Sequence, residues 1–343
     1  MVIFYYYFTR TIIINKDTNL KILVTGGAGY IGSHFVKILT NNNINTVVLD
    51  NLSRGHKEAV PENVPLEIAD LLDINSLQSV FEKHSFDAIV HFAAFAYVGE
   101  SVEDPQMYYQ NNVVGSFNLI KTALKANVKK FVFSSTCSLY GNPEEIPISE
   151  KLPTNPINPY AQTKLMIENI LRDFDKSYDM RSVFLRYFNA AGSDFDGMIG
   201  ESHDPEPHLI PIVLNTALGK REKVLIFGDD YETKDGTCIR DYIHVNDLGD
   251  AHLKALQYLN DGGKTDVINL GTGEGNSVKE LIDTAERITG KTINSEIAER
   301  REGDPAILVA DNKRAKEVLG WVPKHNLDDI ISSAYKWHKE PRY

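Results

Sequence analysis

A glycine-rich segment near the start of the chain most constrains its fold. Apolar residues 22–25 lead directly into residues 26–32, which read GGAGYIG, and an amphipathic stretch follows over residues 33–39. Residues 27–32 match G-x-G-x-x-G between an expected strand and an expected helix, the context that this pattern requires. The glycines permit a tight turn, close helix–strand packing, and close approach of the backbone to a pyrophosphate. We therefore expect a dinucleotide at the N-terminus of this helix, where free N–H groups favour anions.

Short apolar runs alternate with longer amphipathic stretches over the first half of the chain. The runs that read as buried strands are residues 21–24, 46–49, 88–92, 130–133 and 182–185. The helical stretches follow Gly29, Ser76, Asp104 and Pro159. Strands and helices that alternate at this spacing predict an α/β fold, a Rossmann-type doubly wound parallel sheet.

The alternation breaks near residue 189, which marks the expected domain boundary. Three prolines fall within residues 204–211, and residues 229–237 are polar and rich in turn formers. We expect residues 20–188 to form the dinucleotide-binding domain. Residues 189–343 should form mainly a smaller, mixed substrate-binding lobe, with some interleaving of strands or helices between the two.

The first nineteen residues differ from the rest. Residues 2–8 are apolar and aromatic, residues 9–11 interrupt them, and residues 12–14 are apolar again. The segment is too short and too interrupted to span a bilayer, and it lacks the basic start and small-residue cleavage site of a signal peptide. We expect residues 1–19 to be a spurious upstream start or a loosely attached strand rather than a membrane anchor.

Charge and cysteine content exclude several classes of protein. A formal net charge of −11 argues against a nucleic-acid-binding protein, which needs a basic face. Cys137 and Cys238 are the two cysteines of the chain, too few for a disulfide framework and without metal-ligand spacing. We expect no metal site and a reducing, cytoplasmic compartment.

An acidic residue follows the glycine turn at the spacing of an adenosine-ribose contact. Asp50 ends the second predicted strand, where its carboxylate can accept from the ribose hydroxyls. No arginine follows it immediately, so NAD is favoured over NADP, although Arg54 lies close in the sequence. A simple turn at Asp50 and Asn51 is the alternative.

A tyrosine and a lysine stand one turn apart on a predicted helix. Asn158 and Pro159 predict its start, as an N-cap followed by a proline at the first helical position. The helix places Tyr160 and Lys164 on one face. A free tyrosine has a pKa of about 10, and an ammonium one turn away lowers it. The pair is a device for proton transfer, as alcohol–ketone interconversion requires, or a chance spacing of the kind that many helices contain.

These motifs occur in a recognisable order along the chain. They are the glycine turn, Asp50, residues 134–136 (SST), Tyr160 and Lys164. Further stretches that carry the likeness are residues 98–101, 108–113, 186–189, 240–244, 301–304 and 319–321. With them the chain resembles the extended short-chain dehydrogenase/reductase family, and within it the NAD-dependent UDP-hexose 4-epimerases. The resemblance covers the chain from residue 20 to near the C-terminus.

The resemblance implies NAD bound tightly in the larger lobe and a UDP-sugar in the cleft. Tyr160 would be the general base that takes the O4 proton while hydride passes from C4 to the nicotinamide. Lys164 would lower the tyrosine pKa and hold the nicotinamide ribose, and Thr136 would hydrogen-bond O4. The 4-keto sugar would turn over and take the hydride back on its other face. This is the interconversion of UDP-galactose and UDP-glucose in galactose metabolism, with no net redox change.

The resemblance also implies two sets of ligand contacts. The cofactor set is Gly26, Gly29, Tyr30, Ile31, Gly32, Asp50, Asn51, Asp70, Leu71, Phe92, Ala93, Ala94, Asn112, Tyr160, Lys164 and Phe188. The substrate set is Thr136, Asn189, His208, Leu209, Phe227, Arg240, Tyr242, Arg301 and Asp304. Arg240 and Arg301 suit a diphosphate, since a guanidinium makes forked bonds to phosphate oxygens. A surface ion pair is the alternative for each.

Some positions depart from the family pattern or leave the substrate open. Ala96 stands where some members have a lysine near the cofactor. Cys137 and Ser138 follow the threonine where nucleotide-sugar 4,6-dehydratases have Asp-Glu, which disfavours that reaction. Leu308 aligns with the position that limits pocket size, and it leaves N-acetylhexosamine, pentose and uronate sugars open. A non-catalytic NAD-binding sensor remains a further alternative, although such proteins commonly lose the tyrosine or the lysine.

The expected partner is a second copy of the chain. Family members usually pair two helices of each subunit into a four-helix bundle, and residues 104–125 and 159–176 are the corresponding stretches. We expect a homodimer, while the alternative is that these apolar faces belong to the internal core.

Overall fold

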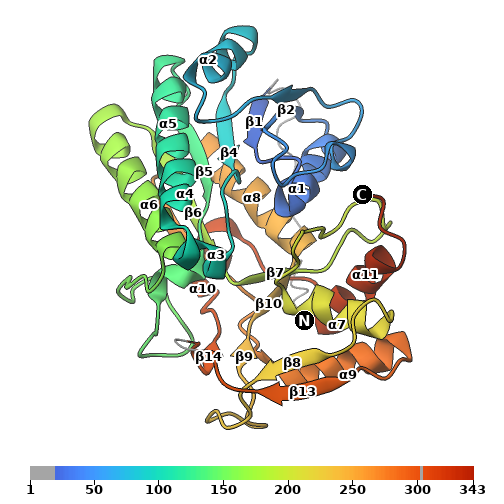
Figure 1. Cartoon of the computed structure of the whole chain (residues 1–343). Coiled ribbons are helices and arrows are strands. Elements are labelled where there is room, and N and C mark those ends of the chain that lie inside the picture. Colours follow the sequence, from blue (N-terminus) through green and yellow to red (C-terminus); the bar gives the residue numbers. More distant parts are fainter. Residues whose placement is uncertain (1–19, 302–303) are drawn as a thin grey trace, which may run out of the picture.

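A seven-stranded sheet forms the centre of the larger lobe (Figure 1). Its order is β11-β6-β5-β4-β1-β2-β3, and every neighbouring pair is parallel. The strands are β1 (Lys21–Thr25), β2 (Asn45–Asp50), β3 (Leu66–Ile68), β4 (Ala88–His91), β5 (Lys130–Ser134), β6 (Arg181–Tyr187) and β11 (Asp266–Leu270). The computed structural model describes residues 20–301 and 304–343, so the expectation for residues 1–19 lies outside it. The predicted Rossmann-type α/β fold is confirmed.

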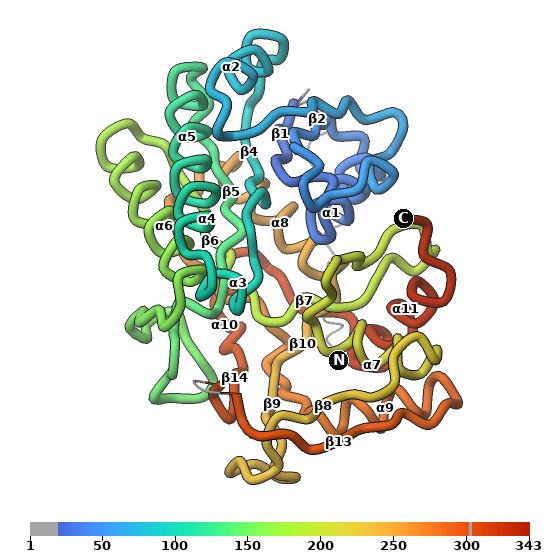
Figure 2. The backbone as a smooth tube through the Cα atoms, viewed as in Figure 1, coloured from blue at the N-terminus to red at the C-terminus, as the bar shows by residue number. Residues whose placement is uncertain are grey.

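Helices cover both faces of this sheet, and their backbone paths can be followed in Figure 2. One face packs against α1 (Tyr30–Asn41) and α8 (Val245–Asn260) through a buried apolar cluster. The other packs against α2 (Ile74–Lys83), α5 (Gly115–Lys125) and α6 (Pro159–Tyr178). Because both faces are buried, the strands are nearly continuous apolar runs. None of the described helices is both long and apolar enough to cross a membrane.

Short helical segments follow several strands at their carboxyl ends. They are η1 (Lys57–Ala59), α3 (Val98–Glu103), α4 (Pro105–Tyr108), the π-helical turn η2 (Tyr109–Val114) and η3 (Cys137–Tyr140). The helix predicted after Asp104 is present, because the carboxylate of Asp104 accepts from the backbone N–H of Met107 at 3.0 Å and caps α4. The π-helical turn then joins α4 to α5.

The smaller lobe is built around a second apolar cluster. In the described chain α7 (Leu209–Ala217), α9 (Val278–Thr289) and α11 (Leu327–Lys339) supply most of its buried side chains. Short strands complete the lobe and its junction with the larger one: β7 (Asn189–Ala191), β8 (Val224–Phe227), β9 (Ile239–Arg240), β10 (Tyr242–His244), β12 (Asn276–Ser277), β13 (Ser295–Ala298) and β14 (Ile307–Leu308). They pair as β10-β7, β12-β9-β14 and β13-β8.

The chain returns to the larger lobe after it has entered the smaller one. β11 is an edge strand of the seven-stranded sheet, and α8 packs on that sheet beside α1. α10 (Lys313–Leu319) and Trp321 join the same cluster, and the indole N–H of Trp321 donates to the carbonyl of Asp247 at 3.0 Å. Residue 188 therefore does not divide the chain into two self-contained bodies.

Candidate active site

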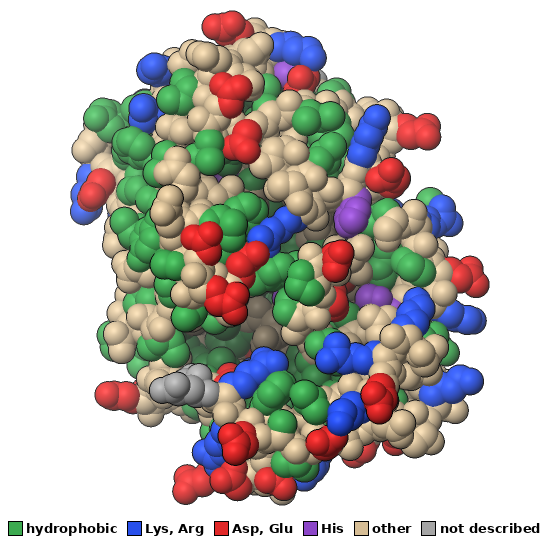
Figure 3. Space-filling view, in the orientation of Figure 1, with side chains coloured by type: hydrophobic (Ala, Val, Ile, Leu, Met, Phe, Trp, Pro, Cys, Tyr) green, Lys and Arg blue, Asp and Glu red, His purple; other side chains and the backbone are tan. Residues whose placement is uncertain are grey.

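A cavity of about 1600 Å³ opens between the two lobes, and the surface is hollowed there in Figure 3. It lies beyond the carboxyl ends of the parallel strands, where doubly wound sheets bind their ligands. Its walls include every residue in the two predicted contact sets except Asn112. The fold thus gathers into one cleft residues that are up to 278 positions apart in the sequence, from Gly26 to Asp304.

The glycine turn at one end of the cavity leaves room only for a bare backbone. Gly26 has φ +71°, and a Cβ there would lie 2.5 Å from the backbone nitrogen of Ala93. A Cβ on Gly32 would lie 2.1 Å from the carbonyl oxygen of Gly26. Gly29 is the N-cap of α1, and among the described residues no side chain caps this helix. The turn therefore presents helix N–H groups to the cavity, which fits the pyrophosphate of a dinucleotide.

The carboxylate at the end of β2 is held toward the adenosine side of the cavity. Asp50 accepts from the backbone N–H groups of Ala28 at 3.0 Å and Leu52 at 2.9 Å. Burial raises the pKa of this carboxyl group, and the two backbone bonds oppose that rise. Arg54, the residue that left NADP open, is paired with both carboxylate oxygens of Glu100 at 2.6 and 2.7 Å. An acidic acceptor and an engaged arginine fit a ribose 2′-hydroxyl, as in NAD.

The predicted catalytic side chains meet in the middle of the cavity. Helix α6 starts as the sequence indicates, because Asn158 accepts from the backbone N–H of Ala161 at 2.9 Å and Pro159 is the first helical residue. Tyr160 lies on the cavity wall, and its hydroxyl hydrogen-bonds that of Thr136. Lys164 is buried one turn further on and donates to the carbonyl of Ser134 at 2.8 Å.

The prediction that Lys164 lowers the pKa of Tyr160 below its usual value is wrong for the protein alone. Burial raises the pKa of Tyr160 well above its usual range, Tyr187 adds to the rise, and the bond from Thr136 opposes it. Burial also lowers the pKa of Lys164 to about 7. Desolvation disfavours the charged form of each group. The phenol therefore keeps its proton at neutral pH.

Two arginines stand at the opposite end of the cavity from the glycine turn. Arg240 donates to Asp304 at 2.7 Å and to the carbonyl of Pro305 at 2.8 Å. Arg301 places its guanidinium over the ring of Phe227, 4.0 Å from the centroid. The predicted alternative of an ion pair therefore holds for Arg240, but the pair lies in the cavity wall rather than on the open surface. Both guanidinium groups are placed to receive an anion.

A buried ion pair clamps α6 against the sheet behind these residues. Glu168 accepts from Arg186 at 2.9 and 2.6 Å and from the hydroxyl of Ser135 at 2.7 Å. Arg186 also donates to the hydroxyl of Tyr140 at 3.0 Å. Since Glu168 lies one turn beyond Lys164 on α6, the clamp sets the distance between that helix and the segment that carries Thr136.

Comparison with known proteins agrees with this geometry. The model of a family described as the NAD dependent epimerase/dehydratase family matches residues 22–271. The chain belongs to this family. A UDP-glucose 4-epimerase from Halalkalibacterium halodurans is 52% identical over 322 residues, which are 94% of this chain and 96% of that protein.

Solved structures of UDP-glucose 4-epimerases superpose on nearly the whole of this chain. A UDP-glucose 4-epimerase from Brucella ovis in complex with NAD is 46% identical, with a TM-score of 0.90 over 93% of this chain and 98% of that one. The enzyme from Bifidobacterium longum in complex with NAD⁺ and UDP is 38% identical, with a TM-score of 0.89 over 94% and 98% of the two chains.

One predicted cofactor contact, Asn112, does not line the cavity. Asn112 is fully buried behind the cavity wall, where its side chain accepts from the N–H of Phe95 at 2.8 Å and donates to the carbonyl of the same residue at 3.0 Å. Its amide also donates to Thr163 at 3.1 Å. Asn112 therefore holds the loop after β4 rather than lining the cleft.

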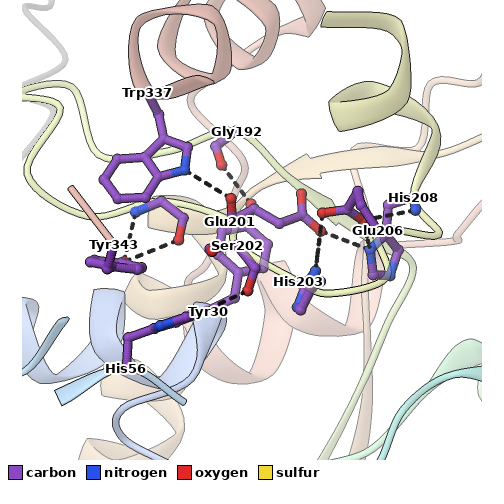
Figure 4. Close-up of polar contacts among 11 residues, drawn as sticks. Tyr30, His56, Gly192, Glu201, Ser202, His203, Glu206, His208, Trp337 and Tyr343 are labelled. Atoms are coloured by element: carbon purple, nitrogen blue, oxygen red, sulfur yellow. Dashed lines mark hydrogen bonds and ion pairs between the residues drawn. The ribbon is translucent and has the colours of Figure 1, made fainter. Parts of the chain in front are cut away.

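The sequence reading also missed a group of ionisable residues in the cavity wall. Glu201, His203 and Glu206 lie there beside His208, with imidazole nitrogens turned toward the carboxylates (Figure 4). The carboxylates raise the pKa of His203 to about 9 and that of His208 to about 10, while the imidazoles lower the pKa of Glu201 to about 2. The available signal was the spacing E-x-H-x-x-E-x-H over residues 201–208.

Proposed function

We propose that this protein is a UDP-glucose 4-epimerase, an NAD-dependent isomerase that interconverts UDP-galactose and UDP-glucose. The observation that carries the proposal is that Tyr160, Thr136 and Lys164 line the same cavity as the glycine turn, which suits a dinucleotide, and as Arg240 and Arg301, which suit a diphosphate. Such a cavity suits a reaction in which a sugar at the end of a nucleotide meets a bound redox cofactor.

The chain's own residues bind both partners and move one proton. The glycine turn holds the pyrophosphate, Asp50 the adenosine ribose, and Lys164 the nicotinamide ribose. NAD, when bound, supplies the hydride acceptor for C4 and brings positive charge into the pocket beside the phenol. That charge favours the phenolate, so Tyr160 would first release its own proton to solvent; the phenolate then accepts the O4 proton and returns it when the sugar is reduced again. Thr136 orients O4 toward the phenol oxygen.

Inversion at C4 requires that the nucleotide stay fixed while the keto sugar turns. The anchoring charges are Arg240 and Arg301, whereas the side chains around Tyr160 in the cavity wall, such as Thr136 and Tyr187, carry hydroxyl groups and no charge. Uneven anchoring lets the sugar present either face without release of the nucleotide. The cofactor returns to its starting state in each cycle, so no external reductant is consumed.

The activity is tested by incubating the purified protein with UDP-galactose without added reductant and assaying UDP-glucose. Tyr160→Phe should retain bound NAD and lose about 10²–10⁴-fold in kcat, the usual contribution of a positioned acid–base group. Tyr178→Phe, at the exposed end of the same helix, is the matched control and should keep full activity. Near-normal turnover by Tyr160→Phe would refute its role. NAD-bound wild-type protein that makes no UDP-glucose would point to the sensor or to another sugar.

The range of sugars rests on Leu308. This residue lies in β14 beside Arg240 in β9, its carbonyl accepts from Asp241 at 3.1 Å, and its side chain faces the cavity. Because the backbone at residue 308 is held by these bonds, a larger side chain there would reduce the volume available to the sugar. Turnover of a panel of N-acetylhexosamine, pentose and uronate UDP-sugars decides between these substrates. Leu308→Tyr should reduce only the activity toward the bulkier N-acetylated sugars.

The active unit is proposed to be a homodimer in the cytoplasm. Exposed apolar side chains gather on the predicted pairing helices and next to them: Val98, Val102, Tyr109, Val114, Phe117 and Tyr178. A four-helix bundle between two copies would cover them. Light scattering should give twice the monomer mass, and Val114→Glu should give monomers; a monomeric wild type would exclude the bundle. Both cysteines are free thiols, which suits a reducing compartment.

A further inference from the structure

Four side chains in the segment between β7 and α7 aim their ligand atoms at one point. One nitrogen or oxygen from each of Glu201, His203, Glu206 and His208 lies within 4.8 Å of all the others. Two imidazole nitrogens and two carboxylate oxygens form a common donor set for divalent transition metals. We propose that these residues bind such an ion, with Zn²⁺ the best match.

Four nitrogen–oxygen distances in the cluster lie near those of a tetrahedral zinc site. Bonds of about 2.0–2.1 Å around a tetrahedral Zn²⁺ separate the ligand atoms by about 3.3–3.4 Å. Nδ1 of His203 lies 3.4 Å from Glu201 and 3.3 Å from Glu206. Nδ1 of His208 lies 2.9 Å and 2.8 Å from the same two carboxylates. The two contacts of His203 match this spacing, and the two contacts of His208 are about half an ångström shorter.

A network of ion pairs accounts for these contacts less completely than a metal ion does. An imidazole Nδ1 carries at most one proton, yet each of the two faces two carboxylate oxygens (Figure 4). Two N–H groups therefore serve four N···O contacts. The carboxylate of Glu201 is 4% exposed and has these two imidazoles as its partners in the described chain. One cation would bond to all four side chains at once.

The donors are held in place by the surrounding fold. The carbonyl of Glu201 accepts from the indole N–H of Trp337 at 2.8 Å. The backbone N–H of Gly200 lies 3.1 Å from the hydroxyl of Tyr343, and this hydroxyl lies 3.2 Å from the carbonyl of the same glycine. The carboxylate of Glu206 accepts from the backbone N–H of His208 at 2.9 Å, at the start of α7. Supports of this kind orient metal ligands before the ion binds.

The position of the cluster assigns the ion a structural role. The ring of His203 packs edge-on against Tyr30 and Tyr97, both on the cofactor lobe, at centroid distances of 6.3 and 5.7 Å. His208 begins α7 on the substrate lobe. Four protein ligands leave no open position for substrate, which is typical of a structural zinc site. The ion would therefore fasten residues 201–208 where the two lobes meet, and it would engage Nδ1 of His208, a predicted substrate contact.

The two cysteines predict no metal site, but neither of them belongs to this cluster of imidazoles and carboxylates. The proposed zinc site is tested with untagged full-length protein that has been treated with a chelator, reloaded with Zn²⁺ and passed through a desalting column. Zinc counted by mass spectrometry should reach a single ion per chain, and zinc should raise the melting temperature. Co²⁺ in its place should give the intense visible bands of a four-coordinate ion.

Variants separate this site from adventitious binding. His203→Gln and Glu206→Gln should lower zinc affinity by more than the roughly tenfold that loss of even an outer-shell partner causes. His84→Gln is the control, because His84 lies 2.8 Å from Glu67 in an ordinary pair elsewhere, and it should bind zinc as the wild type does. Wild-type zinc well below one ion per chain, or equal zinc in His203→Gln, would overturn the proposal. If the variants fail to fold, the Co²⁺ spectrum of the wild type decides alone.

Discussion

Removing one partner of the buried Glu168–Arg186 pair should destabilise the protein far more than removing both. Glu168 is fully buried, Arg186 is 4% exposed, and they share two hydrogen bonds. Glu168→Leu deletes these bonds and the bond from Ser135, at about 1.5–3 kcal/mol each for charged groups. The buried leucine returns about 1.5–3 kcal/mol. The difference is about 3–6 kcal/mol, and other buried pairs that lose one charge are destabilised by about 3–5 kcal/mol, which is the loss expected here.

The double variant Glu168→Leu/Arg186→Met removes the stranded guanidinium as well. Replacement of a whole buried pair by apolar side chains of similar size is often neutral or stabilising. The hydroxyl of Tyr140 loses Arg186 but keeps Asn269, to which it donates at 2.7 Å. The double variant should therefore recover most of the stability that the single variant loses.

Equilibrium urea unfolding measures both changes. Trp321 and Trp337, the two tryptophans of the chain, are both buried, so their fluorescence reports on unfolding. With an m-value of about 3 kcal/mol/M, a loss of 3–5 kcal/mol moves the midpoint down by about 1–1.7 M. NAD must be held at one concentration throughout, because ligand binding itself stabilises the native state. A double variant no more stable than Glu168→Leu would refute the reasoning.

Three further perturbations test other parts of the structure. Gly32→Ala should abolish retention of NAD, measured by release of cofactor from the purified protein, because its Cβ would meet a carbonyl oxygen at 2.1 Å; retained cofactor would contradict the close packing. Arg240→Gln should weaken UDP binding by about 10–100-fold in calorimetry, as loss of a charged hydrogen bond predicts, and unchanged affinity would place the diphosphate elsewhere. Burial lowers the pKa of His252 to about 4, so the unfolded state takes up a proton that the native state refuses between about pH 6.5 and 4. Stability should fall as the pH falls through that window, and at about pH 5 this residue alone should cost about 2 kcal/mol. His252→Phe should therefore reduce the difference between the urea midpoints measured at neutral pH and at about pH 5. An unchanged difference would show that His252 is not the source.

The parts of the structure that sequence patterns predicted are those in which local chemistry leaves one choice. The bare backbone at Gly32 is demanded by the carbonyl of Gly26, six residues earlier in the same turn. Asn158 and Pro159 start α6 through bonds within a single helical turn. The α/β alternation follows in the same way, because strands buried on both faces must be apolar along their whole length.

What sequence patterns missed depends on contacts between distant segments. Whether the charge of Lys164 controls Tyr160 is decided by desolvation, which involves the whole packed wall around them. Asn112 lies in the π-helical turn, and its side chain bonds to Phe95 behind the cavity wall, a contact across 17 residues that no local pattern predicts. The pair between Glu168 and Arg186 joins α6 to β6, and no local spacing announces it.

The edge position of β11 has a consequence for how the protein is made. Synthesis proceeds from the N-terminus, and β6 finds its outer neighbour only after residue 270 has left the ribosome. Until then the nascent chain carries an unpaired edge with the apolar residues Val183, Phe184 and Leu185, the kind of edge that pairs with other chains. A transcript cut short before residue 266 should therefore yield aggregates and not a cofactor-binding fragment. The last quarter of the polypeptide completes the sheet that β1 begins.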